Sequence, residues 1–322
     1  MSSCHRRWRR TRPAAFLALA LAAATGTSGA PVTRCGNGLY LKAASVNASA
    51  DELLGLARSA GVRYLYFYGP GAEPFDSPLA AFAEKARATL ANPALVVMLG
   101  RRLCTAGNDS HCLDLGSAIA REQLATRAAA AWHAGFDGVQ LDLEPVADGD
   151  EALIALLEHL RALKPPSKLL SIAGDSLVLD AAARQAVRQT PQGAQPLPGW
   201  SAGYYRRVMA SVDQVTVMNY DTAIRDGAQY RAFTVWQTKQ LLALRPASLD
   251  LQIGLPTAVP GRRGLFDRAA ENLANGLAGV RDAFGGPGGC PPHTGVTLFT
   301  ADGMTSASWQ DVTRDFGTGS PP

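Results

Sequence analysis

Hydrophobic segments of two kinds alternate along the chain from residue 38 onward. Short runs rich in β-branched and aromatic residues predict strands, and longer runs rich in alanine and leucine predict helices. Strands are expected at 39–45, 63–69, 94–100, 136–146, 168–174, 214–222, 250–257 and 295–300. Helices are expected near 50–60, 77–90, 116–134, 150–163, 203–211, 229–244, 268–283 and 306–315.

A strand followed by a helix, repeated to the end of the chain, predicts an α/β fold with a parallel sheet. A single-domain (β/α)8 TIM barrel fits the pattern, and about 250 residues is the usual size of that fold. A doubly wound sheet is the alternative, but it normally carries a glycine-rich phosphate turn after its first strand, and none is found here. The segment 176–202 is rich in proline, glutamine and glycine, which predicts a surface excursion after the fifth strand. No clear α+β insertion follows the seventh strand.

The N-terminal segment has the layout of a secretory signal peptide. Five arginines at 6–12 precede an apolar stretch at 14–24 and a small-residue segment at 25–30. We therefore expect a signal peptide at 1–30 and an exported domain at 31–322, with an uncleaved membrane anchor as the alternative. The five arginines are uncompensated, so the formal net charge of +4 becomes −1 without them. This removes the compositional support for a nucleic-acid partner.

Four cysteines remain after that segment, and an even number favours disulfides in an exported protein. Cys104 and Cys112 bracket a short polar loop, so we expect them to pair, which leaves Cys35 for Cys290. A metal site is the alternative, but no Cys-x-x-Cys is present and the histidines are scattered. We expect no metal and no cofactor, and a secreted or periplasmic location.

The fourth predicted strand is apolar but carries three polar residues at alternate positions. Gln140, Asp142 and Glu144 share one face of the strand, because successive side chains of a strand point to opposite sides. An amide and two acids are costly to bury without a purpose. A helix cap or a loop ion pair is the alternative for any single acid. The sixth strand, however, also ends in a polar cluster, Met218–Asp221, and active-site groups of a barrel lie at the C-terminal ends of its strands.

The fourth strand resembles the D-G-x-D-x-D-x-E signature of glycoside hydrolase family 18, the chitinases and endo-β-N-acetylglucosaminidases. Asp137, Gly138, Asp142 and Glu144 match, and Gln140 stands where the family usually has an aspartate.

Two further segments extend the resemblance over residues 38–316. The run 218–221 is similar to the family's M-x-Y-D, and 254–256 is similar to its G-x-P on strand seven. Phe299 takes the place of the family's tryptophan at the end of the last strand. Without the α+β insertion, we expect a shallow cleft suited to a short oligosaccharide or a glycan end.

The resemblance implies retaining hydrolysis in which the substrate's own acetamido group takes part. Glu144 would act as the acid, Asp142 would hold the acetamido N–H, and Tyr220 would orient the acetamido group. Gln140 would belong to the same catalytic group. Asp221, Met218, Asn219 and Phe299 are the expected substrate-binding residues; Asp137 and Gly138 are expected to be structural.

The implied function is an exported hydrolase of β-linked N-acetylglucosamine glycans, with an oligo- or polysaccharide as its partner. A glycan-binding protein on the same barrel is the alternative, because an amide at Gln140 cannot pass on a proton as an aspartate can. A third hypothesis is an esterase, since Gly174-Asp175-Ser176-Leu177 spells an esterase motif. That motif lies mid-chain and His293 lacks the matching aspartate, which favours a strand-end turn.

Overall fold

The computed structural model describes residues 35–42, 46, 50–68, 77–104, 112–178, 199–257, 266–286 and 289–317. All of these residues belong to one compact unit, Thr33–Pro322. The expected signal peptide and most of the excursion predicted at 176–202 lie outside the described residues.

The strands form a closed barrel in the order of the sequence, and all neighbouring strands are parallel. Each strand of the described chain is followed by at least one helix, which confirms the predicted (β/α)8 TIM barrel. The strands are β1 (Asn37–Leu41), β2 (Val62–Tyr68), β3 (Ala94–Arg102), β4 (Gly138–Glu144), β5 (Leu169–Gly174), β6 (Gln214–Met218), β7 (Asp250–Pro256) and β8 (Thr294–Phe299).

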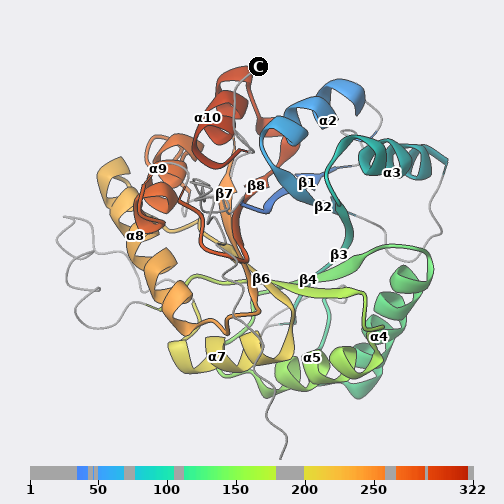
Figure 1. Cartoon of the computed structure of the whole chain (residues 1–322). Helices are drawn as coiled ribbons and strands as arrows, with labels where there is room; N and C mark the ends of the chain where they lie inside the picture. Colours follow the sequence, from blue (N-terminus) through green and yellow to red (C-terminus); the bar gives the residue numbers. More distant parts are fainter. Residues whose placement is uncertain are drawn as a thin grey trace, which may run out of the picture. The chain divides into compact units, whose positions relative to one another are not determined.

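Helices surround the barrel on its outer side (Figure 1). They are α2 (Ala50–Ser59), α3 (Ser77–Thr89), α4 (Ala118–His133), α5 (Glu151–Leu163), α7 (Ala202–Ser211), α8 (Gly227–Leu244), α9 (Leu273–Ala283) and α10 (Ser306–Phe316), with a 3-10 helix, η1 (Ala301–Gly303), after β8. None of the helices in the described ranges is long and apolar enough to cross a membrane.

Three predicted boundaries are wrong by several residues. The strand expected at 39–45 already ends at Leu41. The helix expected from 268 begins only at Leu273, because Asn272 caps it by accepting a hydrogen bond from the backbone N–H of Asn275. The strand expected to reach 222 ends at Met218. Asp221 then adopts a left-handed backbone with φ 58°, which is incompatible with a strand.

The barrel interior near the N-terminal ends of the strands is polar and filled by large side chains. The hydroxyl of Tyr66 donates to Gln214 Oε1 at 2.8 Å, and that of Tyr64 donates to Asp250 Oδ2 at 2.5 Å. Gly38 makes room for these rings, since a Cβ there would lie 2.7 Å from the ring of Tyr66. Closely packed, hydrogen-bonded side chains therefore fill the barrel near the N-terminal ends of its strands and support the residues at the C-terminal ends.

Both expected disulfides are present. Cys104 and Cys112 close a loop after β3, and Cys35, just before β1, is joined to Cys290, just before β8. The Cys35–Cys290 bridge links the segments that lead into the first and last strands, β1 and β8, which are neighbours in the closed barrel. It spans a sequence separation of 255 residues. A cross-link over so long a loop restricts the unfolded chain more than a local one does.

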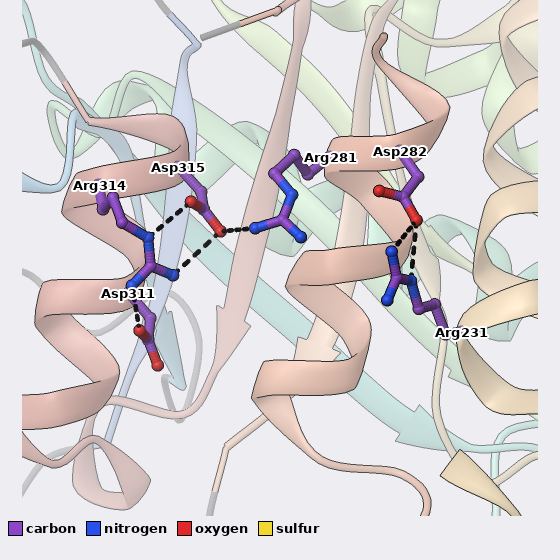
Figure 2. Close-up of polar contacts among 6 residues, drawn as sticks. All are labelled: Arg231, Arg281, Asp282, Asp311, Arg314 and Asp315. Carbon is purple, nitrogen blue, oxygen red and sulfur yellow. Dashed lines mark hydrogen bonds and ion pairs between the residues drawn. The ribbon is translucent and has the colours of Figure 1, made fainter. Parts of the chain in front are cut away.

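The last three helices are joined by ion pairs (Figure 2). Arg231 on α8 donates to Asp282 on α9 at 2.5 and 2.8 Å. Asp315 on α10 accepts from Arg281 at 3.2 Å and from Arg314 at 2.9 Å. Its side chain is only 3% exposed, so this carboxylate is buried and neutralised by two guanidinium groups.

Candidate active site

Strand β4 carries polar side chains at alternate positions towards its C-terminal end. Gln140 is fully buried, whereas Asp142 and Glu144, two and four positions further on, are partly exposed. The intervening aliphatic residues are buried in the core between the strands and the helices. The alternation expected from the sequence thus places both acids at the upper, C-terminal end of the barrel, with the amide beneath them.

Gln140 is held by hydrogen bonds at both ends of its carboxamide. Its Oε1 accepts from the hydroxyl of Tyr40 at 2.6 Å, and its Nε2 donates to Ser171 Oγ and Thr216 Oγ1, each at 3.1 Å. These contacts join β1, β4, β5 and β6 in one layer. An amide fixed in this way supports the residues above it but cannot change its charge.

An aromatic cluster lines the same end of the barrel. The rings of Tyr220 and Phe299 are stacked with centroids 5.1 Å apart and an interplanar angle of 19°. Tyr40 meets Phe299 edge-on at 5.5 Å, and Tyr68 lies 6.3 Å from it. Because Tyr68, Tyr220 and Phe299 are each partly exposed, they present an aromatic surface, and the charge of Asp142 acts on two of its rings, Tyr68 and Tyr220.

The charge of Asp142 raises the pKa values of neighbouring tyrosines. Burial, chiefly, raises the pKa of Tyr220 well above its usual value, and Tyr40, Asp142 and other neighbours raise it further. Burial and then the carboxylate of Asp142 likewise raise the pKa of Tyr68. These hydroxyls therefore keep their protons at neutral pH and can donate hydrogen bonds to a bound molecule.

The residues that follow β6 separate into two groups. Met218 lies on the inward-facing row of the strand, with Gln214 and Thr216, and is partly exposed. The amide of Asn219, in contrast, is buried against α8. It donates to Thr234 Oγ1 at 2.8 Å and accepts from Gln237 at 2.7 Å. The amide of Asn219 is thus bonded to α8, and its expected role in substrate binding stays a prediction.

Asp137 and Gly138 lie at the lower end of β4. The carboxylate of Asp137 accepts from the backbone N–H of Leu95 at 2.9 Å and from Arg87 at 2.8 Å. A Cβ at Gly138 would lie 2.8 Å from the Cβ of Leu169 on β5. Both residues thus fit strand β4 against its neighbours.

Asp175 is a site residue that the sequence did not single out. It directly follows β5 and is mostly buried, and the charge of Asp142 acts on it. Burial first, and Asp142 second, raise the pKa of its carboxyl to about 6. In the sequence this position stood out only as part of the esterase motif, although its place after a strand end was a signal that it belongs to the C-terminal end of the barrel.

Glu271 is a second residue that the sequence did not reveal. It lies in the turn before α9, fully buried, and its Oε1 accepts from the N–H and the hydroxyl of Thr222 at 2.9 and 2.7 Å. Burial is the main cause that raises its pKa to about 7, and the neighbouring Asp221 adds to it. Glu271 thereby holds the segment that directly follows Tyr220.

The esterase hypothesis finds no support in this geometry. Ser176 follows β5 at the upper end of the barrel, and its hydroxyl donates to the carbonyl oxygen of Met218 at 3.3 Å. The backbone carbonyl of His293 instead accepts a hydrogen bond from Leu251, near the start of β7 at the opposite end. The two side chains cannot form a nucleophile–base pair.

Metal binding has no obvious site either. Within the ranges that the structure describes, no group of three or more histidine, cysteine, aspartate or glutamate residues could hold a metal ion.

Comparisons with known proteins find solved structures of the same barrel fold. The structure is similar to the Bacillus megaterium spore cortex-lytic enzyme SleL, with a TM-score of 0.56 and 12% identity over 88% of this chain and 75% of the other. It is also similar to the GH18 chitinase ChiB from Flavobacterium johnsoniae, with a TM-score of 0.54 and 13% identity over 88% and 94% of the two chains. A chitinase from Bacteroides thetaiotaomicron gives a TM-score of 0.53 at 13% identity, over 88% and 96%. No family model and no curated protein matches the sequence. At such low identity these likenesses establish the barrel alone.

Proposed function

We propose that the protein is an exported glycoside hydrolase that cleaves β-linked N-acetylglucosamine-containing glycans with retention of configuration. The observation that carries the proposal is that Asp142 and Glu144 lie on one face of β4 at its C-terminal end. At the same end of the barrel the rings of Tyr220 and Phe299 are stacked. The solved structures of similar fold include two named as chitinases, which supports the same substrate class.

In the first half of the reaction, Glu144 donates its proton to the glycosidic oxygen as the bond from that oxygen to the anomeric carbon breaks. The carbonyl oxygen of the substrate's own acetamido group attacks the anomeric carbon and forms an oxazolinium ion. Asp142 accepts a hydrogen bond from the acetamido N–H, and its fixed negative charge offsets the positive charge that develops there.

Tyr220 and Phe299 position the sugar for this attack. The protonated phenol of Tyr220 donates to the acetamido group and aligns its oxygen with the anomeric carbon. The ring of Phe299, stacked on Tyr220 and flanked by Tyr40 and Tyr68, offers an apolar surface to the sugar ring. Asp221 and Met218 line the same edge as binding residues.

In the second half, the carboxylate of Glu144 removes a proton from a water molecule, which attacks the anomeric carbon. The bond to the acetamido oxygen breaks, the acetamido group is restored, and the product keeps the starting configuration. Glu144 thus serves first as acid and then as base.

Export is part of the proposal because of the arginine-rich apolar leader and the two disulfides, which are typical of oxidising compartments.

Replacing the acid tests the assignment. Glu144→Gln should lower kcat/KM for an aryl β-chitobioside by at least about 100-fold, since general acid catalysis contributes that much or more. The matched control is Glu151→Gln, which removes an exposed carboxylate at the start of α5 that pairs only with Arg207 among the contacts described. Undiminished hydrolysis by Glu144→Gln, or an equal loss in the control, would contradict the role of Glu144.

A glycan-binding protein on this barrel is the second candidate, favoured by the uncharged Gln140. Wild-type protein that binds chito-oligosaccharides by calorimetry but releases no product between pH 4 and pH 9 would establish it instead.

A further inference from the structure

Tyr220 and Asp221, which are partly exposed, lie between two buried residues. Asn219 precedes them, and its amide is hydrogen-bonded to helix α8. Thr222 follows them, and its N–H and hydroxyl both donate to Glu271 Oε1, at 2.9 and 2.7 Å. The stretch from Asn219 to Thr222 is therefore held at both ends and partly exposed in the middle.

Helix α8 holds Asn219 by its backbone as well as by its side chain. The hydroxyl of Tyr230 donates to the carbonyl oxygen of Asn219 at 2.6 Å and accepts from its amide at 3.1 Å. The same amide donates to Thr234 Oγ1 at 2.8 Å. Because the carbonyl group of Asn219 belongs to the peptide bond that leads into Tyr220, these contacts fix the point at which Tyr220 leaves the barrel.

Asp221 depends on support from the residue that follows it. Its backbone is left-handed, with φ 58°, a conformation that costs free energy in a residue other than glycine and persists where neighbouring contacts hold it. Thr222 gives both of its hydrogen-bond donors to Glu271, and its Oγ1 accepts from the N–H of Ile224 at 3.3 Å. The turn after Tyr220 is therefore fixed by one buried carboxyl group.

The turn that carries Glu271 is joined to helices α8 and α9. The N–H of Glu271 donates to the carbonyl oxygen of Asp267 at 2.6 Å, and the amide of Asn275 on α9 donates to that of Ala270 at 2.9 Å. A Cβ at Gly227, the first residue of α8, would lie 2.6 Å from Asn275 Nδ2. The N-terminal ends of the two helices thus meet closely beside the turn.

Gly279 lets α9 pack closely against α8 further along. A Cβ at Gly279 would lie 2.6 Å from the Cβ of Thr234, whose hydroxyl accepts from Asn219. The ion pair of Arg231 with Asp282 joins the same two helices (Figure 2). Helices α8 and α9 therefore form one support, which keeps the two ends of the stretch in a fixed relation.

We propose that Glu271 is a positioning residue for the hydrolysis: through Thr222 it fixes the backbone that presents Tyr220 to the acetamido group. The inference rests on the proposed function, because it assigns the contact to the alignment of the phenol. Glu271 acts through the backbone and none of its covalent bonds changes in the reaction. Its contribution is an acceptor oxygen, so a side chain that keeps such an oxygen keeps Tyr220 in place.

The first test is kinetic and uses an aryl β-chitobioside. Glu271→Ala removes the acceptor oxygen and should lower kcat at least about tenfold, because a displaced phenol aligns the acetamido oxygen poorly. KM should stay within about threefold, since Asp142 and Phe299 still hold the sugar. Glu271→Gln keeps an acceptor oxygen and should retain at least about a third of the wild-type kcat.

Two further variants keep this test independent of folding. Asp315→Ala, the matched control, also removes a buried carboxylate, on α10, and should leave kcat unchanged. Thr222→Val removes the hydroxyl and keeps the N–H, so it should lower kcat less than Glu271→Ala and add little to it in the double variant. An unchanged kcat in folded Glu271→Ala, or equal losses in Glu271→Ala and Glu271→Gln, would overturn the inference.

The second test requires no activity. Proton NMR should show nuclear Overhauser effects between the rings of Tyr220 and Phe299, whose centroids are 5.1 Å apart. These effects should be lost in Glu271→Ala and persist in Glu271→Gln. If they persist in Glu271→Ala, the carboxyl group does not position Tyr220 and the inference fails, whatever the enzyme hydrolyses. Their loss in a protein that cleaves no acetamido sugar would refute the proposed function and keep the positioning role.

Discussion

Two carboxylates of this protein, Asp315 and the less buried Asp175, have opposite surroundings. Asp315, between α9 and α10, faces the guanidinium groups of Arg281 and Arg314 (Figure 2). Asp175, just after β5, has a pKa raised to about 6 by burial first and by the charge of Asp142 second. The first arrangement neutralises a buried charge, whereas the second brings like charges together.

The difference separates structural from functional charges. A buried acid with two arginine partners has its charge balanced within the fold, and removing one member of such a group leaves an uncompensated charge. An acid whose pKa is raised by burial and by another acid is typical of sites where a shifted pKa serves chemistry. The comparison predicts that removing Asp315 affects stability, while removing Asp175 affects the pH dependence of activity.

The largest effect on stability is expected at the ion pairs of α10. Asp315→Asn should lower the free energy of unfolding by about 2 kcal/mol, because it removes a buried charge that the partly buried guanidinium of Arg281 balances, while the exposed Arg314 keeps Asp311. The control is Asp282→Asn on α9, whose side chain is 36% exposed and whose pair with Arg231 should contribute less than about 1 kcal/mol. Chemical denaturation measures both. Equal effects of the two variants would show that burial does not distinguish these pairs.

A smaller effect is expected at Glu271, whose pKa is raised from 4.5 to about 7. Between these values the folded protein binds more protons than the unfolded chain, so stability is greatest below the lower value and declines as pH rises through the higher. Glu271→Gln keeps an oxygen that can accept from Thr222 and removes the titration. The decline between pH 6 and pH 7.5 should then be smaller by about 1 kcal/mol.

Denaturation at several pH values checks this, with the exposed Glu151→Gln as control. If Glu271→Gln shows the same decline as the wild type, burial of Glu271 does not affect the pH dependence of stability.

The barrel could be predicted because its signals are local and repeated. Each strand is a short run of β-branched and aromatic residues, and each is followed by an alanine- or leucine-rich helix, so the order of elements alone selects the topology. The two disulfides followed from the count and spacing of cysteines. The end of β6 was placed too late because Asp221 adopts a left-handed conformation that residue type does not reveal.

The candidate site was predictable only where it lies on a strand with a clear alternation. Asp142 and Glu144 stood out because acids are unusual in so apolar a run. Asn219 lies one residue past β6, where its side chain turns to α8 and bonds Thr234 and Gln237, contacts that the sequence does not indicate. Glu271 meets Thr222 across about 50 residues of sequence, a contact that only the folded chain brings about.

The central claim is that the substrate's acetamido group takes part in the reaction. Asp142 holds its N–H, and Glu144 protonates the glycosidic oxygen. The most direct measurement compares hydrolysis of an aryl β-chitobioside and an aryl β-cellobioside, which lacks the acetamido groups, with NMR detection of the first anomer released. The account predicts hydrolysis of the chitobioside alone, with the β-anomer appearing first. Comparable hydrolysis of both compounds, or first release of the α-anomer, would contradict it.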